Sequence, residues 1–330
     1  MKALVIRKPQ ELVIDEINDP NITSEEDVIV QVEACGVCRT DFHLLHGLGF
    51  AKYPVIPGHE FVGRIFKMGK LAEKFFKVGQ RVVVDPNLPC FLCEWCRKGY
   101  INLCLNPINI GVNKDGAFAE FVKVNFKQCY IIPEDVPKEV AILAEPLSCV
   151  IHGVETANVE KDEDILIVGG GPIGIIFYKV FHEILKMENV EIVEINTVRI
   201  ELAQKIGVKN VSILPTKDKY DVIIETSGTL DGFNLGITHL RPRGRLVQFG
   251  VADKEVKGEV PLYEMYKNEL KILGSFVNPY TMQKAVKILR DNIDIFKGIV
   301  TKEISLEELE NLLKDSKSVT NDLKIMVKII

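Results

Sequence analysis

The chain has 330 residues, of which 47% are hydrophobic and 26% charged, and its formal net charge is -5. This composition is ordinary for a folded globular protein, and the length favours about two domains. The negative charge and the lack of a basic block argue against nucleic acid and against an anionic membrane as partners, so we expect a small-molecule ligand.

The N-terminal stretch and the cysteine content bear on the cellular compartment. Met1–Lys8 is too short an apolar run for a signal peptide, and we expect no segment with the eighteen or so apolar residues of a spanning helix. These features predict a cytoplasmic protein. In that reducing compartment clustered thiols hold metal more often than they form disulfides. We therefore expect clustered cysteines among the eight of this chain to bind metal.

Short segments in which apolar and polar residues alternate fill the first 124 residues, separated by Gly, Pro and Asp. Many short strands with turn residues between them favour a barrel or sandwich. The clearest segments are Leu4–Arg7, Val28–Val32, Phe61–Phe66 and Arg81–Val84. Segment 116–121 predicts a further strand, whose Phe118 lines a substrate pocket or packs in the core.

Side chains that bind metals and carry protons gather after the strand predicted over Val28–Ala34. Cys38, Thr40 and His43 lie within one or two turns of a predicted helix, and His59-Glu60 follows about twenty residues later. Zn²⁺ takes thiolate, imidazole and carboxylate ligands in catalytic sites that leave one position open. We therefore predict a catalytic zinc site. The alternatives are a redox pair of cysteines, or a buried Cys beside a hydrogen-bonded His.

A second group of thiols has the spacing Cys-x-x-Cys-x-x-Cys-x₇-Cys and comprises Cys90, Cys93, Cys96 and Cys104. Four thiolates this close in sequence predict one closed, tetrahedral structural zinc site. An iron–sulfur cluster uses the same ligand type, but the seven-residue gap favours zinc.

A glycine-rich loop connects a predicted buried strand, Ile165–Val168, to a helix predicted over Ile175–Met187. The loop, Gly169-Gly170-Gly171-Pro172-Ile173-Gly174, has the context of a dinucleotide-binding turn. Gly169 permits the tight turn, Gly171 lets a pyrophosphate approach the backbone, and Gly174 lets the helix pack on the strand. The start of the helix offers free N–H groups to the phosphates.

Glu194 ends the next predicted strand, Val190–Glu194, twenty residues after Gly174. An acidic residue there accepts hydrogen bonds from the adenosine ribose, which predicts NAD as the preferred cofactor over NADP. Arg199 is the counter-argument, since an Arg can bind the phosphate of NADP; we expect it near the adenine instead. Further strands are predicted over Asp221–Glu225, Arg245–Val251 and Leu270–Phe276.

The last fifty residues contain too few elements for a third core. We predict helices over Tyr280–Arg290 and Glu303–Leu313 and a final strand over Leu323–Ile330. The expected division is a β-rich domain at 1–145 with a zinc lobe at about 86–108, a nucleotide-binding domain at 146–277, and a segment at 278–330 that completes the first domain.

These residues together resemble the zinc-containing medium-chain alcohol and polyol dehydrogenases over the whole chain. The motifs that carry the resemblance are Gly36–His43, Gly58-His59-Glu60, the four-cysteine lobe, Ala144–Ser148 and the glycine-rich loop. The resemblance implies an α/β plus β fold: a GroES-like barrel and a Rossmann domain with the active site between them. It also implies two zinc ions per chain and NAD, with zinc lowering the pKa of a substrate hydroxyl and NAD taking the hydride. We expect a homo-oligomer, a dimer or a tetramer.

Within that family, Glu145-Pro146-Leu147-Ser148 and the segment 274–281 are similar to the sorbitol, arabinitol and threonine dehydrogenase branch. Arg39, which we expect at the cofactor, is similar to the simple-alcohol branch. The third ligand of the catalytic zinc is Glu60, Glu145 or Cys149. The resemblance favours Glu145, with Glu60 as a neighbouring or alternating ligand.

We also expect Thr40 and His43 to carry the substrate proton to solvent, and Asp41 to orient His59. The leading hypothesis is therefore a zinc-dependent oxidoreductase that moves a hydride between a secondary alcohol, polyol or sugar and NAD. The alternatives are an L-threonine 3-dehydrogenase, a simple-alcohol dehydrogenase, a zinc-free reductase of the same fold, and a nucleotide-binding protein without turnover.

Overall fold

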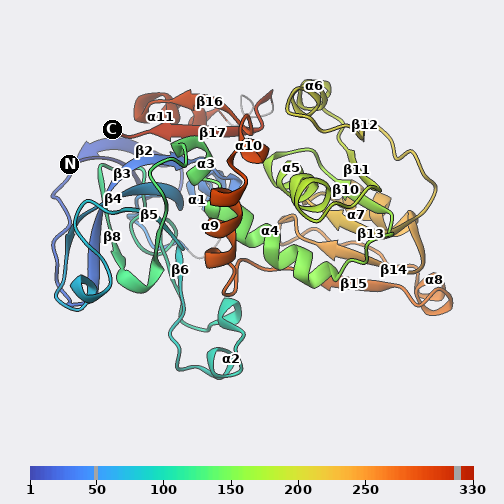
Figure 1. The fold of residues 1–330 in the computed structure, drawn as a ribbon, viewed down its shortest axis with the longest axis horizontal. Coiled ribbons are helices and arrows are strands. Elements are labelled where there is room, and N and C mark those ends of the chain that lie inside the picture. The colour runs from blue at the N-terminus through green and yellow to red at the C-terminus, as the bar shows by residue number, and fades with distance from the viewer. Residues whose placement is uncertain (48–50, 316–320) are drawn as a thin grey trace.

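The computed structural model describes residues 1–47, 51–315 and 321–330. Figure 1 shows two halves, each built on its own large sheet, with helices α4 (Ala144–Ala157) and α9 (Met282–Asp291) between them. The N- and C-termini lie close together on the same half (Figure 1).

The sheet of the first half has seven strands in the order β16-β17-β3-β4-β5-β9, with β8 paired to β3. Its centre is β3, which pairs antiparallel with β4, β8 and β17 and contains the strand predicted from alternation. Two small hairpins, β1-β2 and β6-β7, complete this half. The strands are β1 (Lys2–Lys8), β2 (Glu11–Glu16), β3 (Asp27–Gly36), β4 (Glu60–Met68), β5 (Arg81–Val84), β6 (Asn87–Leu88), β7 (Ile108–Asn109), β8 (Phe121–Asn125), β9 (Cys129–Ile131), β16 (Val300–Ile304) and β17 (Lys324–Lys328).

The strand predicted over 116–121 is wrong in its start, because β8 begins only at Phe121. Gly116 and Ala117 donate their backbone N–H groups to Ile56 and Gly58 instead, and a side chain at Gly116 would collide with the Gly58 carbonyl. Phe118 is fully buried in the core of this half, so packing is its role.

The sheet of the second half is six-stranded and parallel, in the order β12-β11-β10-β13-β14-β15. Ile165 and Ile167 of β10 pack in one core cluster and Leu166 and Val168 in another, so β10 is buried on both faces, as its continuous apolar run predicts. The strands are β10 (Ile165–Val168), β11 (Val190–Val193), β12 (Val211–Ser212), β13 (Tyr220–Glu225), β14 (Leu240–Gln248) and β15 (Lys271–Gly274).

The helix predicted over Ile175–Met187 begins earlier and is not regular. It starts as α5 (Pro172–Tyr178), because Pro172 is suited to the first helical turn, and continues as a π-helix, η4 (Lys179–Ile184). The remaining α-helices are α1 (Arg39–Leu45), α2 (Glu94–Arg97), α3 (Lys138–Ala141), α6 (Thr197–Lys205), α7 (Leu230–Thr238), α8 (Leu262–Lys267), α10 (Ile293–Phe296) and α11 (Leu306–Lys314); 3₁₀ turns are η1 (Ala72–Lys74), η2 (Ile101–Leu103) and η3 (Phe126–Gln128).

The chain returns to the first half after α9 and α10. β17 pairs antiparallel with β3, and β16 pairs with β17. The helix predicted over Glu303–Leu313 is wrong at its start, since β16 runs to Ile304. α11 begins after Ser305, whose side chain accepts a hydrogen bond from the N–H of Glu308.

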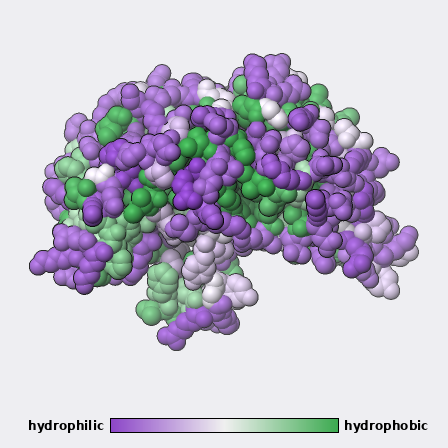
Figure 2. Space-filling view, in the orientation of Figure 1, coloured by the Kyte–Doolittle hydropathy of each residue, from purple (hydrophilic) through white to green (hydrophobic). Residues whose placement is uncertain are grey.

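One segment, Lys138–Ala157, is long and apolar enough to cross a membrane by length and composition, contrary to the expectation that none would be. However, 67% of its most apolar window is buried inside the protein, which is how a core helix behaves. Figure 2 shows apolar side chains over the middle of the molecule, where the two halves meet, among a largely hydrophilic surface.

Candidate active site and metal centres

The four-cysteine lobe projects away from the rest of the first half (Figures 1 and 2). From Asn87 to Asn109 only Cys96 is buried, while Phe91, Leu92 and Leu105 are exposed. The lobe therefore has no apolar core of its own. A segment of this kind needs a cross-link or a bound metal to hold its shape.

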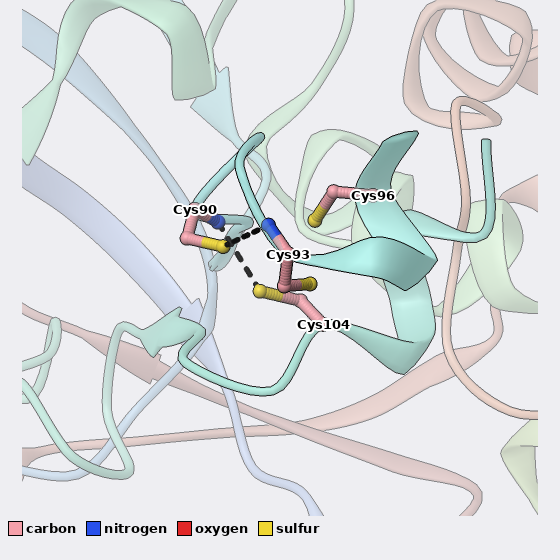
Figure 3. A group of neighbouring side chains, drawn as sticks. All are labelled: Cys90, Cys93, Cys96 and Cys104. Carbon is pink, nitrogen blue, oxygen red and sulfur yellow. Dashed lines mark hydrogen bonds between the residues drawn. The ribbon is translucent and has the colours of Figure 1, made fainter. Parts of the chain in front are cut away.

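The thiols of this lobe point toward one another (Figure 3). The four sulfur atoms of Cys90, Cys93, Cys96 and Cys104 all lie within 4.8 Å of one another, and all eight cysteines of the chain are free thiols. Backbone N–H groups donate to the sulfurs, including that of Cys90 to Cys104 Sγ at 3.2 Å. Such donors, first among them the N–H of Leu105, lower the pKa of Cys93 to about 6. This donor set fits a tetrahedral zinc.

A second group of side chains that could hold a metal ion lies in the first half, where α1 and β4 begin. Donor atoms of Cys38, His59 and Glu60 all lie within 4.8 Å of one another. Cys38 is the residue before the first turn of α1, and Glu60 is the first residue of β4. Gly58 has a φ of +92°, which lets the chain turn just before His59.

Asp41 is fully buried and hydrogen-bonds to the backbone at two points of this group, next to each of its ligands. Its Oδ2 accepts a hydrogen bond from the Cys38 N–H at 2.8 Å, and its Oδ1 accepts one from the Gly58 N–H at 3.2 Å. Oδ1 also lies 3.8 Å from His59 Nδ1, a buried nitrogen that has no hydrogen-bond partner among the described residues. Asp41 therefore faces the nitrogen that a carboxylate would use to orient this ring.

Glu145 and Cys149 share one face of α4, where the Cys149 thiol donates to Glu145 Oε1 at 3.4 Å. Burial raises the pKa of Glu145 to about 7, against the opposing effect of the nearby His59. Glu145 is not a member of the compact group, which takes Glu60 as its carboxylate. Glu60 is therefore the nearer of the two glutamates to Cys38 and His59, while the charges of His59 and Glu60 still act on Glu145.

Thr40 and His43 both lie on α1. The Cys38 thiol donates to the Thr40 hydroxyl at 3.5 Å, so this hydroxyl is within reach of the metal group. Burial, followed by the charge of Arg39, lowers the pKa of His43 below its ordinary 6.5. His43 is therefore neutral, and able to accept a proton, over a wider pH range than a free histidine.

The glycine-rich loop has an open side and a closed side. A side chain at Gly174 would collide with the Gly169 carbonyl, whereas one at Gly171 would meet nothing within 4 Å. Gly171 directly precedes α5, and no side chain caps that helix. The open side can therefore present backbone N–H groups, such as that of Ile173, to a phosphate; Pro172 has no N–H and begins the helix.

Glu194 stands beside this loop and is buried. Its Oε2 accepts a hydrogen bond from the Gly170 N–H at 2.9 Å, and its Oε1 accepts one from the Asn196 N–H at 2.9 Å. Arg199 Nη1 lies 3.9 Å from Oε2. The carboxylate is thus fixed at the end of β11, next to the loop that would hold the pyrophosphate.

Sequence reasoning missed two charged residues at this site. Lys324, on β17, is buried and forms an ion pair with Glu60. Glu225 ends β13 fully buried and accepts hydrogen bonds from Ser227, Gly228 and Gln248. The sequence did contain a sign of such residues, namely a charged residue within an otherwise apolar strand, as Lys324 is in the final strand.

Comparison with known families gives two matches. Residues 24–134 match the model of the alcohol dehydrogenase GroES-like domain, and residues 172–291 match that of the zinc-binding dehydrogenase. The chain is 31% identical to D-arabinitol dehydrogenase 1 of Uromyces fabae, over 99% of this chain and 97% of that protein. It is 30% identical to an L-threonine 3-dehydrogenase of a Chelativorans species, over 93% of this chain and 93% of that protein.

Among solved structures, the fold superposes on a protein of Sinorhizobium meliloti 1021 described as a zinc-binding dehydrogenase and bound to NADP. The TM-score is 0.93 and the sequence identity 28%, over 99% of this chain and 98% of that one. The GroES-like and Rossmann halves expected from the sequence are therefore confirmed.

Proposed function

The chain belongs to the zinc-binding alcohol dehydrogenases with a GroES-like domain, and we propose that within this family it oxidises a secondary hydroxyl of a polyol or sugar. Membership makes it an oxidoreductase that acts on CH–OH groups with zinc and a nicotinamide dinucleotide. The observation that carries the proposal is the compact group of Cys38, His59 and Glu60, which has the ligand types of a catalytic zinc site.

Two separate donor sets support two zinc ions per chain. The thiols of Cys90, Cys93, Cys96 and Cys104 would hold the structural ion. Cys38 and His59 would hold the catalytic ion together with a glutamate, for which Glu145 and Glu60 are the candidates. When bound there, zinc supplies the positive charge that lowers the pKa of a substrate hydroxyl.

The residues around the catalytic group position it and move the proton. Asp41 holds the backbone of Cys38 and of Gly58 and faces His59 Nδ1, so the two ligands keep a fixed separation. Thr40 Oγ can accept the substrate proton, because a hydroxyl both accepts and donates. The neutral imidazole of His43, three residues further along α1, is placed to pass it to solvent.

The cofactor proposal rests on the second half of the protein. The pyrophosphate of the dinucleotide would lie on the open side of the loop at Gly171, and Glu194 would accept from the adenosine ribose. When held there, NAD would supply the acceptor for the substrate hydride. We propose NAD rather than NADP, because a 2′-phosphate beside Glu194 would meet a like charge.

L-Threonine is the second candidate substrate, because an L-threonine 3-dehydrogenase is similar over nearly the whole chain. Its oxidation also removes a hydride from a secondary carbinol. It differs in requiring groups that bind an ammonium and a carboxylate, whereas a polyol requires only neutral hydrogen-bonding groups.

A substrate panel tests the proposal. The purified protein is incubated with NAD⁺ and each of arabinitol, sorbitol, altritol, aldoses, L-threonine and simple alcohols, and NADH is followed by absorbance. We expect the highest kcat/KM for a polyol. A higher value for L-threonine would establish the second candidate, and no reduction with any member of the panel would refute a dehydrogenase acting on these alcohols.

Three further features remain proposals. We propose a cytoplasmic homo-oligomer, and a division of the chain at residues 145/146 and 277/278. The pairing of β17 with β3 supports the assignment of the C-terminal segment to the first domain. Sedimentation of the purified protein tests the oligomeric state.

A further inference from the structure

One face of α1 is turned toward the second half of the protein. Arg39 and His43 lie four residues apart on this helix and therefore share a face. The Arg39 guanidinium donates a hydrogen bond to the Ser227 carbonyl of the second half, and His43 is partly buried one turn further along. The parts of the second half that lie next to Ser227 are thus the ones that can act on His43.

Glu225, the last residue of β13, holds together two backbone segments at this boundary. Its side chain accepts hydrogen bonds from the N–H groups of Ser227 at 2.8 Å and Gly228 at 3.0 Å. Its backbone carbonyl accepts one from the Gly250 N–H at 2.7 Å. The two segments touch, since a side chain on Gly228 would collide with the Val251 carbonyl. The segment that begins at Gly250 therefore lies against the turn that α1 contacts.

Asp253 lies in this segment, three residues after Gly250, and is exposed. Among the described residues, the charged groups that act on His43 are Arg39 and His46, which are close to it in sequence, and Asp253 from the second half. Burial first, and then Arg39 and His46, lower the pKa of His43, whereas Asp253 raises it. Asp253 is thus the carboxylate that favours the protonated ring.

A proton that leaves through His43 makes the ring an imidazolium for part of each cycle. Burial and the positive charge of Arg39 both oppose that form. Asp41, the carboxylate of α1 itself, is occupied by two backbone N–H groups of the metal group. The charge that offsets the imidazolium must therefore come from outside α1, and Asp253 supplies it.

We propose that Asp253 is a positioning residue of the proton path, which stabilises the imidazolium of His43 from across the boundary between the two halves. This inference rests on the proposed dehydrogenase function. The substrate hydroxyl loses its proton to Thr40, whose own proton passes to a ring nitrogen of His43 and from there to water; Asp253 takes no proton. The first half thus carries the proton, and the nucleotide-binding half supplies the charge that favours its transfer.

The test measures the pKa of His43 directly. Zinc-loaded protein is labelled with ¹³C at Cε1 of histidine, the NMR signals are followed as the pH is changed, and His43→Gln identifies the signal of His43. Asp253→Asn removes the charge and Asp253→Glu keeps it. Glu255→Gln is the matched control, because it removes an exposed carboxylate two residues further along the same segment. The pH profile of kcat with NAD⁺ and a polyol is recorded for each protein.

We expect Asp253→Asn to lower the pKa of His43 by about half a unit, the size of effect expected from one exposed charge a short distance away. The acidic limb of the kcat profile should move to lower pH by the same amount, while zinc content and melting temperature stay unchanged. Asp253→Glu and Glu255→Gln should match the wild type. In about 1 M salt the difference between Asp253→Asn and the wild type should shrink, because salt screens exposed charges.

An unchanged pKa of His43 in Asp253→Asn would overturn the proposal. An equal shift in Glu255→Gln would also overturn it, since it would show a general effect of surface charge. A lowered pKa with an unmoved kcat profile would place Asp253 outside the proton path. A protein that reduces no NAD⁺ with any alcohol would refute the proposed function itself, which is a separate outcome because the titration requires no turnover.

Discussion

The guanidinium of Arg39 donates a hydrogen bond to the backbone carbonyl of Ser227 at 3.5 Å. Arg39 follows the metal-group residue Cys38, and Ser227 lies just beyond β13 of the nucleotide-binding sheet. The contact therefore joins the two halves between the metal group and the nucleotide-binding sheet, where we propose that the substrate and the nicotinamide meet. This position agrees with the expectation from the sequence that Arg39 lies at the cofactor.

Removal of one thiol tests the structural zinc. Cys93→Ser should lower the zinc content by one equivalent and reduce the melting temperature, because the lobe has no apolar core to replace the metal. Elemental analysis and thermal unfolding measure both effects. Cys129→Ser is the matched control, since Cys129 is buried outside the lobe; it should keep full zinc. Full zinc and unchanged stability in Cys93→Ser would refute this site.

Replacement of Thr40 tests the first step of the proton path. Thr40→Ala should lower kcat by about 10²–10⁴-fold, the range typical of lost acid–base catalysis, while both zinc ions stay bound. Thr40→Ser keeps the hydroxyl and should retain most of the activity. A near-normal kcat in Thr40→Ala with full zinc would mean that the proton leaves by another path.

Replacement of His43 tests the next step of the proposed proton path. Because burial and Arg39 lower its pKa, the activity of the wild type should fall only below pH 6.5, as the imidazole gains a proton and can no longer accept one. His43→Gln should reduce kcat less than Thr40→Ala does and should remove this limb. A kcat profile of His43→Gln that coincides with the wild-type profile would exclude His43 from the path.

Replacement of Glu194 tests the proposed preference for NAD over NADP. The wild type should show a higher kcat/KM with NAD than with NADP, and Glu194→Gln should shift the ratio toward NADP by about tenfold, since it removes the negative charge that faces the 2′-phosphate. Steady-state kinetics with both cofactors measure the ratio. Equal or better kinetics of the wild type with NADP would contradict the assignment.

Asp85 makes stability depend on pH. Burial raises the pKa of Asp85 to about 6 from its ordinary 3.8, so between these values the unfolded chain releases a proton that the folded protein keeps. The contribution of this carboxyl to stability is therefore full below about pH 4 and is lost as the pH rises through 6.

The variant Asp85→Asn lacks this dependence. Its free energy of unfolding, measured in urea, should improve relative to the wild type by about 1 kcal/mol between pH 5 and 7. Because both proteins carry the same metal groups, the effect of pH on zinc binding cancels in the comparison. A difference that stays constant with pH would show that Asp85 is ionised throughout this range.

Local patterns in the sequence were enough for much of the fold. The alternation around Val28 and the apolar run of β10 predict strands, because burial on one or two faces of a sheet fixes which consecutive residues are apolar. The pairing of strands that are distant in the sequence produces no such local pattern. β12, which has only two residues, and β16, whose last residues Glu303 and Ile304 were assigned to a predicted helix, were missed.

The candidate site likewise has parts that local sequence patterns predict and parts that depend on long-range contacts. Cysteine spacing predicts the lobe, and the order strand, glycine-rich loop, helix predicts the nucleotide turn. The partnership of Lys324 with Glu60 depends instead on three strands meeting at Gly36. No segment of the sequence holds that information, because the residues are separated by more than 260 positions.

Transfer of an isotopic label tests the central claim most directly. The protein is incubated with NAD⁺ and a polyol deuterated at its secondary carbinol carbons, and the NADH formed is analysed by mass spectrometry. The account predicts one deuterium in each NADH, loss of the reaction when a chelator removes zinc, and recovery when zinc is restored. NADH without deuterium, or a reaction that persists after zinc removal, would contradict it.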